Sequence, residues 1–233
     1  MDKTYCGPPP QPVDLWFAWN FDPPLLAVLL LLAVKLRHET YGLAGVAVLA
    51  VAFVSPLCAL SSALFSARVI HHVLLIAVAA PLLGSLWSGR AKNNHLGISF
   101  TVSTALLWVW HYPAAYDLAL SHVGWYWVSQ ISLLASAVWF WTNALSSRHL
   151  PTTKLFSIVA AFAQMGLLGA LLTFAPTALY AAHAVAPFSW GLSPLEDQQL
   201  AGLIMWVPAG VPYAIAAIFV ARDSWNRWKD CPS

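Results

Sequence analysis

Charged side chains are scarce in this chain of 233 residues, of which Asp, Glu, Lys and Arg make up only 9%. An ordinary soluble domain is roughly 25% charged. Hydrophobic residues make up 60% of the chain, and its mean hydropathy is +0.69. So few charges cannot cover a water-facing surface, which excludes an ordinary soluble fold and predicts an integral membrane protein surrounded by lipid. The basic residues are scattered between apolar runs, so we expect no nucleic-acid partner.

Cysteine is scarce too, and a basic leader is missing. The cysteines Cys6, Cys58 and Cys231 are too few and too dispersed to predict a disulfide framework. In the topology that the basic residues predict, Cys6 and Cys231 face opposite compartments, so they cannot pair within one chain. The N-terminus begins Met-Asp-Lys and continues into prolines and Asp14 rather than a basic segment. We therefore expect the first apolar run to remain as a membrane span and not to be removed as a signal peptide.

Long apolar runs dominate what is present. A membrane-spanning helix needs about 20 mainly apolar residues. The first candidate run is short, but aromatic residues before it and Lys35 near its end allow it to cross the membrane. Small residues in the sixth run, such as Gly169, should let helices approach closely. The sequence predicts an all-α bundle of seven transmembrane helices, made of an N-terminal segment 1–23, a membrane domain 24–221 and a tail 222–233. The seven runs are Pro24–Leu36, Tyr41–Leu60, Val69–Trp87, Leu96–Tyr112, Trp125–Leu145, Leu155–Tyr180 and Pro194–Ala221.

The basic residues predict the orientation of this bundle. Nine of the eleven Lys and Arg lie in or beside the connections 37–40, 88–95 and 146–154 and in the C-terminal tail. The remaining loops carry only Lys3 and Arg68. Basic loops face the cytoplasm, so we expect a periplasmic N-terminus, a cytoplasmic C-terminus and a multi-pass protein of the bacterial inner membrane.

The histidines follow the opposite pattern. An imidazole at the edge of a membrane is costly to place there and indicates a function, often as a metal ligand. Five of the eight lie near the predicted outer ends of the apolar runs: His71, His72, His111, His122 and His183.

Several soft or polar side chains are predicted to share one depth. We estimate the depth of a residue by counting 1.5 Å per residue from the cytoplasmic end of its helix. Five residues then lie about 24–27 Å above the cytoplasmic edge of the membrane: Cys58, His72, His111, Gln130 and Met205. Reduced copper favours sulfur ligands, and imidazole binds copper and zinc. We therefore expect a shallow copper(I) site built on His72 and His111, with Cys58, Met205 and His71 as further candidate ligands.

Each of these residues also has a structural interpretation. A buried Cys or Met is often packing material, and an intramembrane His can hydrogen-bond between helices. His71 points about 100° away from His72 around a helix, so only one of the two can face the same neighbour.

Further polar residues flank the expected site. Ser193, Pro194 and Glu196 form a predicted capping box at the start of the last apolar run. Asp197 follows, where it either gates or binds a cation or interacts with the helix dipole.

Arg68 lies on the same helix face as His72, four residues before it. It can pair with Asp117, Glu196, Asp197 or the carboxylate of a partner protein, or remain unpaired at the interface. His122 and His183 are expected in the outer loops above the site.

Four segments resemble the multi-span CtaG family of cytochrome c oxidase assembly factors. Phe65-Ser-Ala-Arg-Val-Ile-His-His-Val-Leu-Leu, followed by Ala80-Pro-Leu-Leu, is similar to its third-helix signature. Trp110-His-Tyr-Pro-Ala-Ala-Tyr-Asp resembles its Trp-His-x-Pro-x-x-Tyr-Asp element. Leu172-Thr-Phe-Ala-Pro and Gly191-Leu-Ser-Pro-Leu-Glu-Asp-Gln-Gln-Leu-Ala-Gly-Leu-Ile-Met-Trp-Val-Pro are similar to its last two helices.

The resemblance implies a non-enzymatic role in maturing a haem-copper oxidase, by supplying copper to its catalytic subunit and receiving it from a periplasmic copper chaperone. It assigns the functional polar roles to His72, His111 and Asp197. The chain departs from the family pattern at three places. Arg68 stands where the family has His, His71 stands where it has Gln, and Ser129-Gln130 replaces a Glu-His pair.

Two other functions fit part of the pattern. A b-type haem or a quinone site in an electron-transfer protein needs two facing histidines at one depth, which His72 and His111 can supply. A second histidine pair near the cytoplasmic side is missing, since His38, His95 and His149 fall in basic loops. A copper permease needs ligands through the membrane, where Met165 is the candidate near mid-bilayer.

Overall fold

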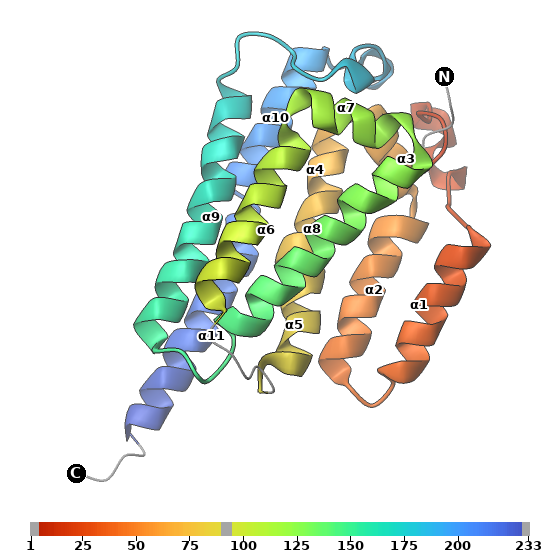
Figure 1. Cartoon of the computed structure of the whole chain (residues 1–233). Coiled ribbons are helices and arrows are strands. Elements are labelled where there is room, and N and C mark those ends of the chain that lie inside the picture. Colours follow the sequence, from red (N-terminus) through yellow and green to blue (C-terminus); the bar gives the residue numbers. More distant parts are fainter. Residues whose placement is uncertain (1–4, 90–94, 230–233) are drawn as a thin grey trace.

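The computed structural model describes residues 5–89 and 95–229, and every regular element within them is helical (Figure 1). Lys3, Arg90, Lys92 and Cys231 lie outside the described residues. The α-helices are α1 (Pro23–Lys35), α2 (Thr40–Val54), α3 (Pro56–Ala63), α4 (Phe65–Val73), α5 (Ala80–Ser88), α6 (Leu96–His111), α7 (Pro113–Ser121), α8 (Val123–Ala144), α9 (Pro151–Thr173), α10 (Pro194–Trp206) and α11 (Gly210–Lys229). The remaining turns of helix are η1 (Pro12–Phe17), η2 (Leu74–Ala79), η3 (Ala181–His183) and η4 (Ala186–Trp190).

The second predicted run is a broken helix. It divides into α2 and α3, which meet at an angle of 50°. Pro56 has no backbone N–H to continue the ladder of α2, and Ser55 caps the new helix by accepting the N–H of Leu57 at 3.2 Å. The predicted run Tyr41–Leu60 therefore corresponds to two helices that meet at a bend before Pro56.

The third run is continuous but widens at its centre. The segments α4, η2 and α5 form one rod over Phe65–Ser88, and η2 is a π-helical turn. Pro81 follows this turn directly. A proline ring clashes with the carbonyl four residues before it, and a wider π-turn relieves that clash.

The last two runs are also shaped by proline. Helix α9 ends at Thr173, seven residues before the predicted boundary at Tyr180, because Pro176 disfavours helix in the residue before it. The chain then forms the connection 174–193 at the upper end of the bundle, which contains η3 and η4 (Figure 1). Pro208 separates α10 from α11, which together replace the predicted run Pro194–Ala221.

Length and hydropathy identify fewer membrane-spanning helices than seven. Within the described residues, Phe65–Ser88, Pro151–Thr173 and Pro194–Asn226 are long and apolar enough, and the bent pair α2–α3 makes a fourth if it counts as one span. Helices α1 and α6 are apolar but shorter. Helix α8 has 22 residues, but Gln130, Asn143 and its serines lower its hydropathy. The fold is thus a multi-pass helical bundle, and seven spans remain a prediction.

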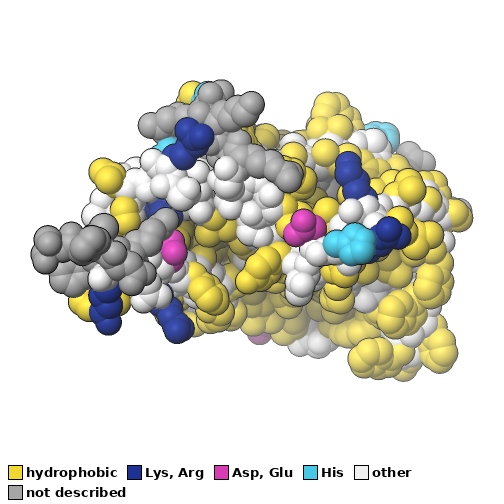
Figure 2. All heavy atoms as spheres, turned by 90° about the horizontal axis from the view of Figure 1, so that it is seen from below, with side chains coloured by type: hydrophobic (Ala, Val, Ile, Leu, Met, Phe, Trp, Pro, Cys, Tyr) yellow, Lys and Arg dark blue, Asp and Glu magenta, His cyan; other side chains and the backbone are white. Residues whose placement is uncertain are grey.

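The connections gather at two ends of the bundle (Figure 1). The α1–α2 and α8–α9 connections lie at the lower end with the C-terminal part of α11. Helices α3 and α7 and the connection 174–193 lie at the upper end, near the N-terminus. Seen from below, the lower end shows separate Lys and Arg side chains on a largely hydrophobic surface (Figure 2). This is the arrangement expected of basic residues around one rim of a membrane protein.

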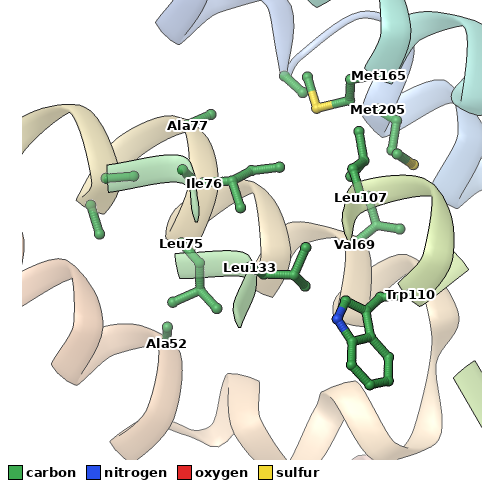
Figure 3. Packing of buried hydrophobic residues seen from close by; sticks show 14 of the residues in the cluster. Ala52, Val69, Leu75, Ile76, Ala77, Leu107, Trp110, Leu133, Met165 and Met205 are labelled. Carbon is green, nitrogen blue, oxygen red and sulfur yellow. The ribbon is translucent and has the colours of Figure 1, made fainter. Parts of the chain in front are cut away.

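Small residues bring the helices close together. A Cβ atom added at Gly169 of α9 would lie 2.7 Å from the carbonyl oxygen of Gly202 on α10. One added at Gly84 of α5 would lie 2.9 Å from the backbone nitrogen of Thr142 on α8. The prediction that Gly169 permits close helix approach is confirmed. One large hydrophobic cluster fills the space between the helices, including Leu75, Leu107 and Leu133 (Figure 3).

The N-terminal segment folds back onto the upper end. Its Cys6 forms a disulfide with Cys58 of α3. Tyr5 stacks on Tyr126 of α8 with ring centroids 5.0 Å apart, and the N–H of Asn20 donates to the carbonyl of Val54 at 2.9 Å. The sequence excluded a Cys6–Cys231 pair and predicted no disulfide framework, and it did not predict the Cys6–Cys58 pair. A pairing across 52 residues depends on how the segment folds back, which cysteine number and spacing do not encode.

Candidate metal-binding site

His72 of α4 and His111 of α6 face each other inside the bundle. Their ring centroids are 5.6 Å apart, the planes are inclined at 78°, and both side chains are buried. Two imidazoles that bind one ion through bonds of ~2 Å have ring centres about 6 Å apart at most. The ring separation therefore lies within the range for two imidazoles on one ion.

Each of these rings has a buried nitrogen without a hydrogen-bond partner in the described part of the chain. Nδ1 of His111 lies 2.7 Å from the carbonyl oxygen of Leu107, so this nitrogen is the donor and Nε2 keeps its lone pair. Nε2 of His72 lies 3.4 Å from the amide nitrogen of Gln130, which donates to it, so the proton of the neutral His72 ring is on Nδ1, which is unpartnered. A metal ion bound at Nδ1 would require this proton to leave or to move to Nε2. Buried polar atoms in proteins usually have a partner, so two unpartnered nitrogens on facing rings indicate a binding site.

Gln130 and His71 complete the immediate surroundings. The side-chain amide of Gln130 also donates to Ser129 at 3.0 Å, and its oxygen Oε1 is buried without a partner. The ring of His71 lies 5.9 Å from that of His72 and packs edge-on against Phe53, with both its nitrogens unpartnered. The structure thus brings His72, His111, His71 and Gln130 into one neighbourhood.

The two sulfur candidates lie in different environments. The sulfur of Cys58 is bonded to Cys6 and so is not a free thiolate, which corrects its expected role as a ligand in this form of the protein. Met205 belongs to the same buried apolar cluster as Val69, Leu107 and Met165 (Figure 3), the environment of a packing side chain. Across residues 5–89 and 95–229, no three His, Cys, Asp or Glu side chains form a metal-binding group.

Arg68 is buried beside this site. Its side chain is only 1% exposed, and all three guanidinium nitrogens lack hydrogen-bond partners among the described residues. The guanidinium lies 5.2 Å from the centroid of the Tyr126 ring. The expected pairs with Asp117, Glu196 and Asp197 do not form, because each of these carboxylates is bonded to backbone elsewhere.

Asp197 holds the start of α4. One carboxylate oxygen accepts the N–H of Phe65 at 2.6 Å, and the other accepts the N–H of Ser66 at 3.1 Å and its hydroxyl at 2.5 Å. Asp197 is fully buried, so it caps a helix 131 residues away in the chain and not the helix that carries it. That geometry explains a buried acid without a cation.

Asp117 and Glu196 have similar structural contacts. Asp117 accepts the N–H groups of Ala181 and Ala182 at 3.3 and 3.1 Å, which fixes the turn η3. The side chain of Glu196 accepts the N–H of Ser193, while its own N–H donates to the Ser193 hydroxyl. The predicted capping box is therefore confirmed.

His183 lies above the site and has both nitrogens bonded. Nδ1 donates to the carbonyl oxygen of Ala63 at 3.2 Å, so Nε2 accepts the Tyr116 hydroxyl at 2.7 Å. Burial lowers the pKa of His183 to about 4, outweighing its bond to Ala63. His122 is exposed at the residue before α8. Neither histidine has a nitrogen directed at a shared ion with His72 and His111.

The two tyrosines around the site are residues that sequence reasoning missed. Tyr116 bonds His183, and Tyr180 donates to the carbonyl oxygen of His111 at 2.9 Å. Tyr116 lies within the segment Trp110–Asp117, whose fixed spacing was the available signal. Tyr180 carries no such signal. Its hydroxyl contacts the carbonyl of His111 only because of the way the connection 174–193 folds over the upper end of the bundle.

The comparisons with known proteins identify a family. A family model described as "Cytochrome c oxidase caa3 assembly factor (Caa3_CtaG)" matches residues 94–227, which is more than half of the chain. No curated protein and no solved structure matches the chain. The match includes His111, Asp117 and Asp197, whereas His72 and Arg68 lie before it. The chain therefore belongs to the family of cytochrome c oxidase caa3 assembly factors, which are not enzymes.

Proposed function

We propose that this assembly factor binds copper(I) between His72 and His111, near the outward face of the membrane, and passes it to the catalytic subunit of a haem-copper oxidase. In this scheme a periplasmic copper chaperone is the donor. The facing pair of imidazoles, each with an unpartnered buried nitrogen, is the observation that carries the proposal.

The ligand set suits an ion that is handed on. Two neutral imidazoles leave copper(I) with few ligands, so a receiving protein can add its own and draw the ion away. The buried surroundings supply no carboxylate to hold a divalent ion more tightly, since Asp117, Glu196 and Asp197 bind backbone N–H groups. Copper in this scheme is therefore cargo and not a resident cofactor.

A haem between the same histidines fits the surroundings less well. The cavity beside His72 is lined by Trp110, Leu120 and Gln130 and is about the size of a single water molecule. A porphyrin is far wider, so its entry would require the helices to separate. We therefore retain haem or quinone binding only as the alternative outcome of the test.

The orientation in this proposal is N-terminus outside and C-terminus inside, with seven spans in the bacterial inner membrane. The Cys6–Cys58 disulfide lies at the end of the bundle opposite the basic connections. Disulfides persist in oxidising compartments such as the periplasm, which supports this orientation. Reporter fusions at the two termini test it, and a cytoplasmic N-terminus would contradict it.

The copper proposal is tested on purified protein and in a deletion strain. The wild-type chain should bind about one copper(I) per molecule, and His72→Ala and His111→Ala should each lose it. His122→Ala is the matched control, because His122 is exposed and away from the pair. In the strain lacking the protein, oxidase activity should return with wild type and His122→Ala but not with the other two variants.

Two other results would contradict the copper proposal. Full copper retention by both His72→Ala and His111→Ala, together with restored oxidase activity, would remove this site from the function. A Soret band in the purified protein would favour the haem alternative.

A further inference from the structure

A groove separates part of α1 from the rest of the bundle. Helix α1 lies at the edge of the bundle and packs mainly against α2 (Figure 1). Residues of α1, α2 and α8 enclose a space of about 360 Å³, which begins at Asp22 and extends down to Leu32 and Leu134. Val28 and Ile131 line this space and are 54% and 59% exposed, so the groove reaches the outer surface of the bundle.

The walls of the groove are almost wholly apolar. Leucine, valine, isoleucine and aromatic side chains form most of them, including Leu29 and Leu49. Gln130 also belongs to the lining, but its amide nitrogen contacts Ser129 and His72 within the bundle. A water molecule needs polar partners, and apolar cavities stay dry. The groove therefore suits hydrocarbon and not water.

The dimensions of the groove suit one extended chain. The walls Leu25–Leu32 and Trp127–Leu134 each extend over about 10 Å at the helical rise of ~1.5 Å per residue. A helix about 10 Å wide fills roughly 800 Å³ over that length, which is more than twice the available space. If a methylene group takes about the volume of a water molecule, roughly 30 Å³, the groove holds about twelve of them. That is most of one lipid acyl chain.

The upper end of the groove carries an acid. Asp22 stands directly before α1 and belongs to the lining. The hydroxyl of Tyr5 donates to one of its oxygens at 2.7 Å. A carboxylate can accept about four hydrogen bonds, so Asp22 can also accept donors from a ligand. The described lining contains no Lys or Arg. A cationic group is therefore favoured at this end, and an anionic group is disfavoured.

We propose that the groove binds one acyl chain of a membrane phospholipid whose amine head group lies at Asp22. Packing alone discriminates poorly between lipids, because every acyl chain is apolar. The carboxylate supplies the selectivity, since an ammonium group donates to it and an anionic head group is repelled. The bound chain fills the gap between α1 and α8 and adds dispersion contacts to both helices.

The test is native mass spectrometry of the purified full chain in a mild detergent. Phosphatidylethanolamine or phosphatidylglycerol with identical acyl chains is added at equal concentration. The first carries an ammonium group, and the second carries a net negative charge. We expect the wild-type chain to retain one phosphatidylethanolamine and to retain phosphatidylglycerol severalfold less.

Variants assign the lipid to the groove. Leu29→Trp on α1 and Ile131→Trp on α8 fill it from opposite walls, and each should reduce retention at least fivefold. Two fillers keep the test valid even if one of them folds poorly. Leu171→Trp is the matched control, because Leu171 is 55% exposed on α9 and outside the lining, so it should retain lipid like wild type. Asp22→Asn should retain both lipids equally.

The outcomes are separable. Loss of phosphatidylethanolamine from both groove variants, with retention by Leu171→Trp, supports the site. Equal retention by wild type and both groove variants, or no retained lipid in wild type, would overturn the proposal. Stronger retention of phosphatidylglycerol, or a copurifying isoprenoid quinone in place of the phospholipid, would also overturn it. The measurement needs no copper, so failure of the copper proposal leaves this result unaffected.

Discussion

The carboxylate of Asp197 on α10 accepts the backbone N–H of Phe65, the first residue of α4, at 2.6 Å. This bond ties the helix that carries His71 and His72 to a helix far along the chain. The segment at the start of α10 thus fixes the position of α4, against which α10 packs directly.

We predict that Asp197→Ala lowers the free energy of unfolding by about 2–3 kcal/mol, because it leaves buried N–H groups at Phe65 and Ser66 without acceptors. Asp197→Asn retains one acceptor oxygen and should lose less. Thermal unfolding of the purified proteins compares the stabilities, which should fall from wild type to Asp197→Asn to Asp197→Ala. Glu196→Gln is the matched surface control, and it should change the stability less than Asp197→Ala does. Equal stability of Asp197→Ala and wild type would show that the cap is unimportant.

His183 should make the upper end of the bundle, where α7 and the connection 174–193 meet, sensitive to acid. Its pKa is lowered to about 4 by burial, whereas an exposed histidine titrates near 6.5. The unfolded chain then binds more protons, so stability falls as the pH drops from about 6.5 towards 4, by on the order of 3 kcal/mol at most. His183→Gln should show a flatter stability profile between pH 7 and pH 5. Parallel profiles for the two proteins would rule out this role of His183.

The Cys6–Cys58 disulfide should stabilise the folded protein by about 2–4 kcal/mol, since it closes a long loop in the unfolded chain. Dithiothreitol should lower the unfolding midpoint of wild type but not of Cys6→Ser. Cys58→Ser should match Cys6→Ser, and the double variant should be no less stable than either. Additive losses in the double variant would indicate that the two sulfurs act separately.

The close approach of α9 and α10 gives a matched pair of glycine variants. Gly169→Ala places a Cβ 2.7 Å from the carbonyl oxygen of Gly202 and should cost about 1–3 kcal/mol through overpacking. Gly166→Ala meets its nearest atom, on Trp206, at 3.6 Å and should be neutral or slightly stabilising through helix propensity. The thermal unfolding midpoints of the two variants test this prediction. A lower midpoint for Gly166→Ala than for Gly169→Ala would contradict the close packing of α9 against α10 at Gly169.

Local pattern was sufficient for some features of the fold. Apolar runs predicted helices at nearly every position where helices occur, and the spacing of Ser193 and Glu196 predicted the capping box. Helix rise alone placed His72, His111 and Gln130 at one depth, and the structure brings them into contact range. These features depend on residues close in sequence or on the regular geometry of a helix.

Features that depend on distant pairings could not be predicted in the same way. The partner of Cys58 follows from the path of the N-terminal segment, and the partner of Asp197 follows from the position of α4. Proline also has different consequences along the chain, since Pro81 lies within a continuous helical rod whereas α9 ends shortly before Pro176. Tertiary packing decides between these outcomes, and a single sequence does not show that packing.

The position of Arg68 predicts an opposing effect on copper. Arg68 and His72 lie on one helix face and line the same cavity, so a fixed positive charge lies close to the proposed ion. At an effective dielectric constant of ~20, removing such a charge should strengthen cation binding by at least about 1 kcal/mol, or roughly fivefold. Arg68→Gln should therefore bind copper(I) more tightly than wild type in chloride-free buffer. Competition with a chromogenic chelator measures this affinity.

Arg148→Gln is the control, because it removes an exposed arginine from the opposite end of the bundle, and it should bind copper like wild type. If Arg68→Gln binds copper more weakly than wild type, Arg68 supports the copper site instead of opposing it.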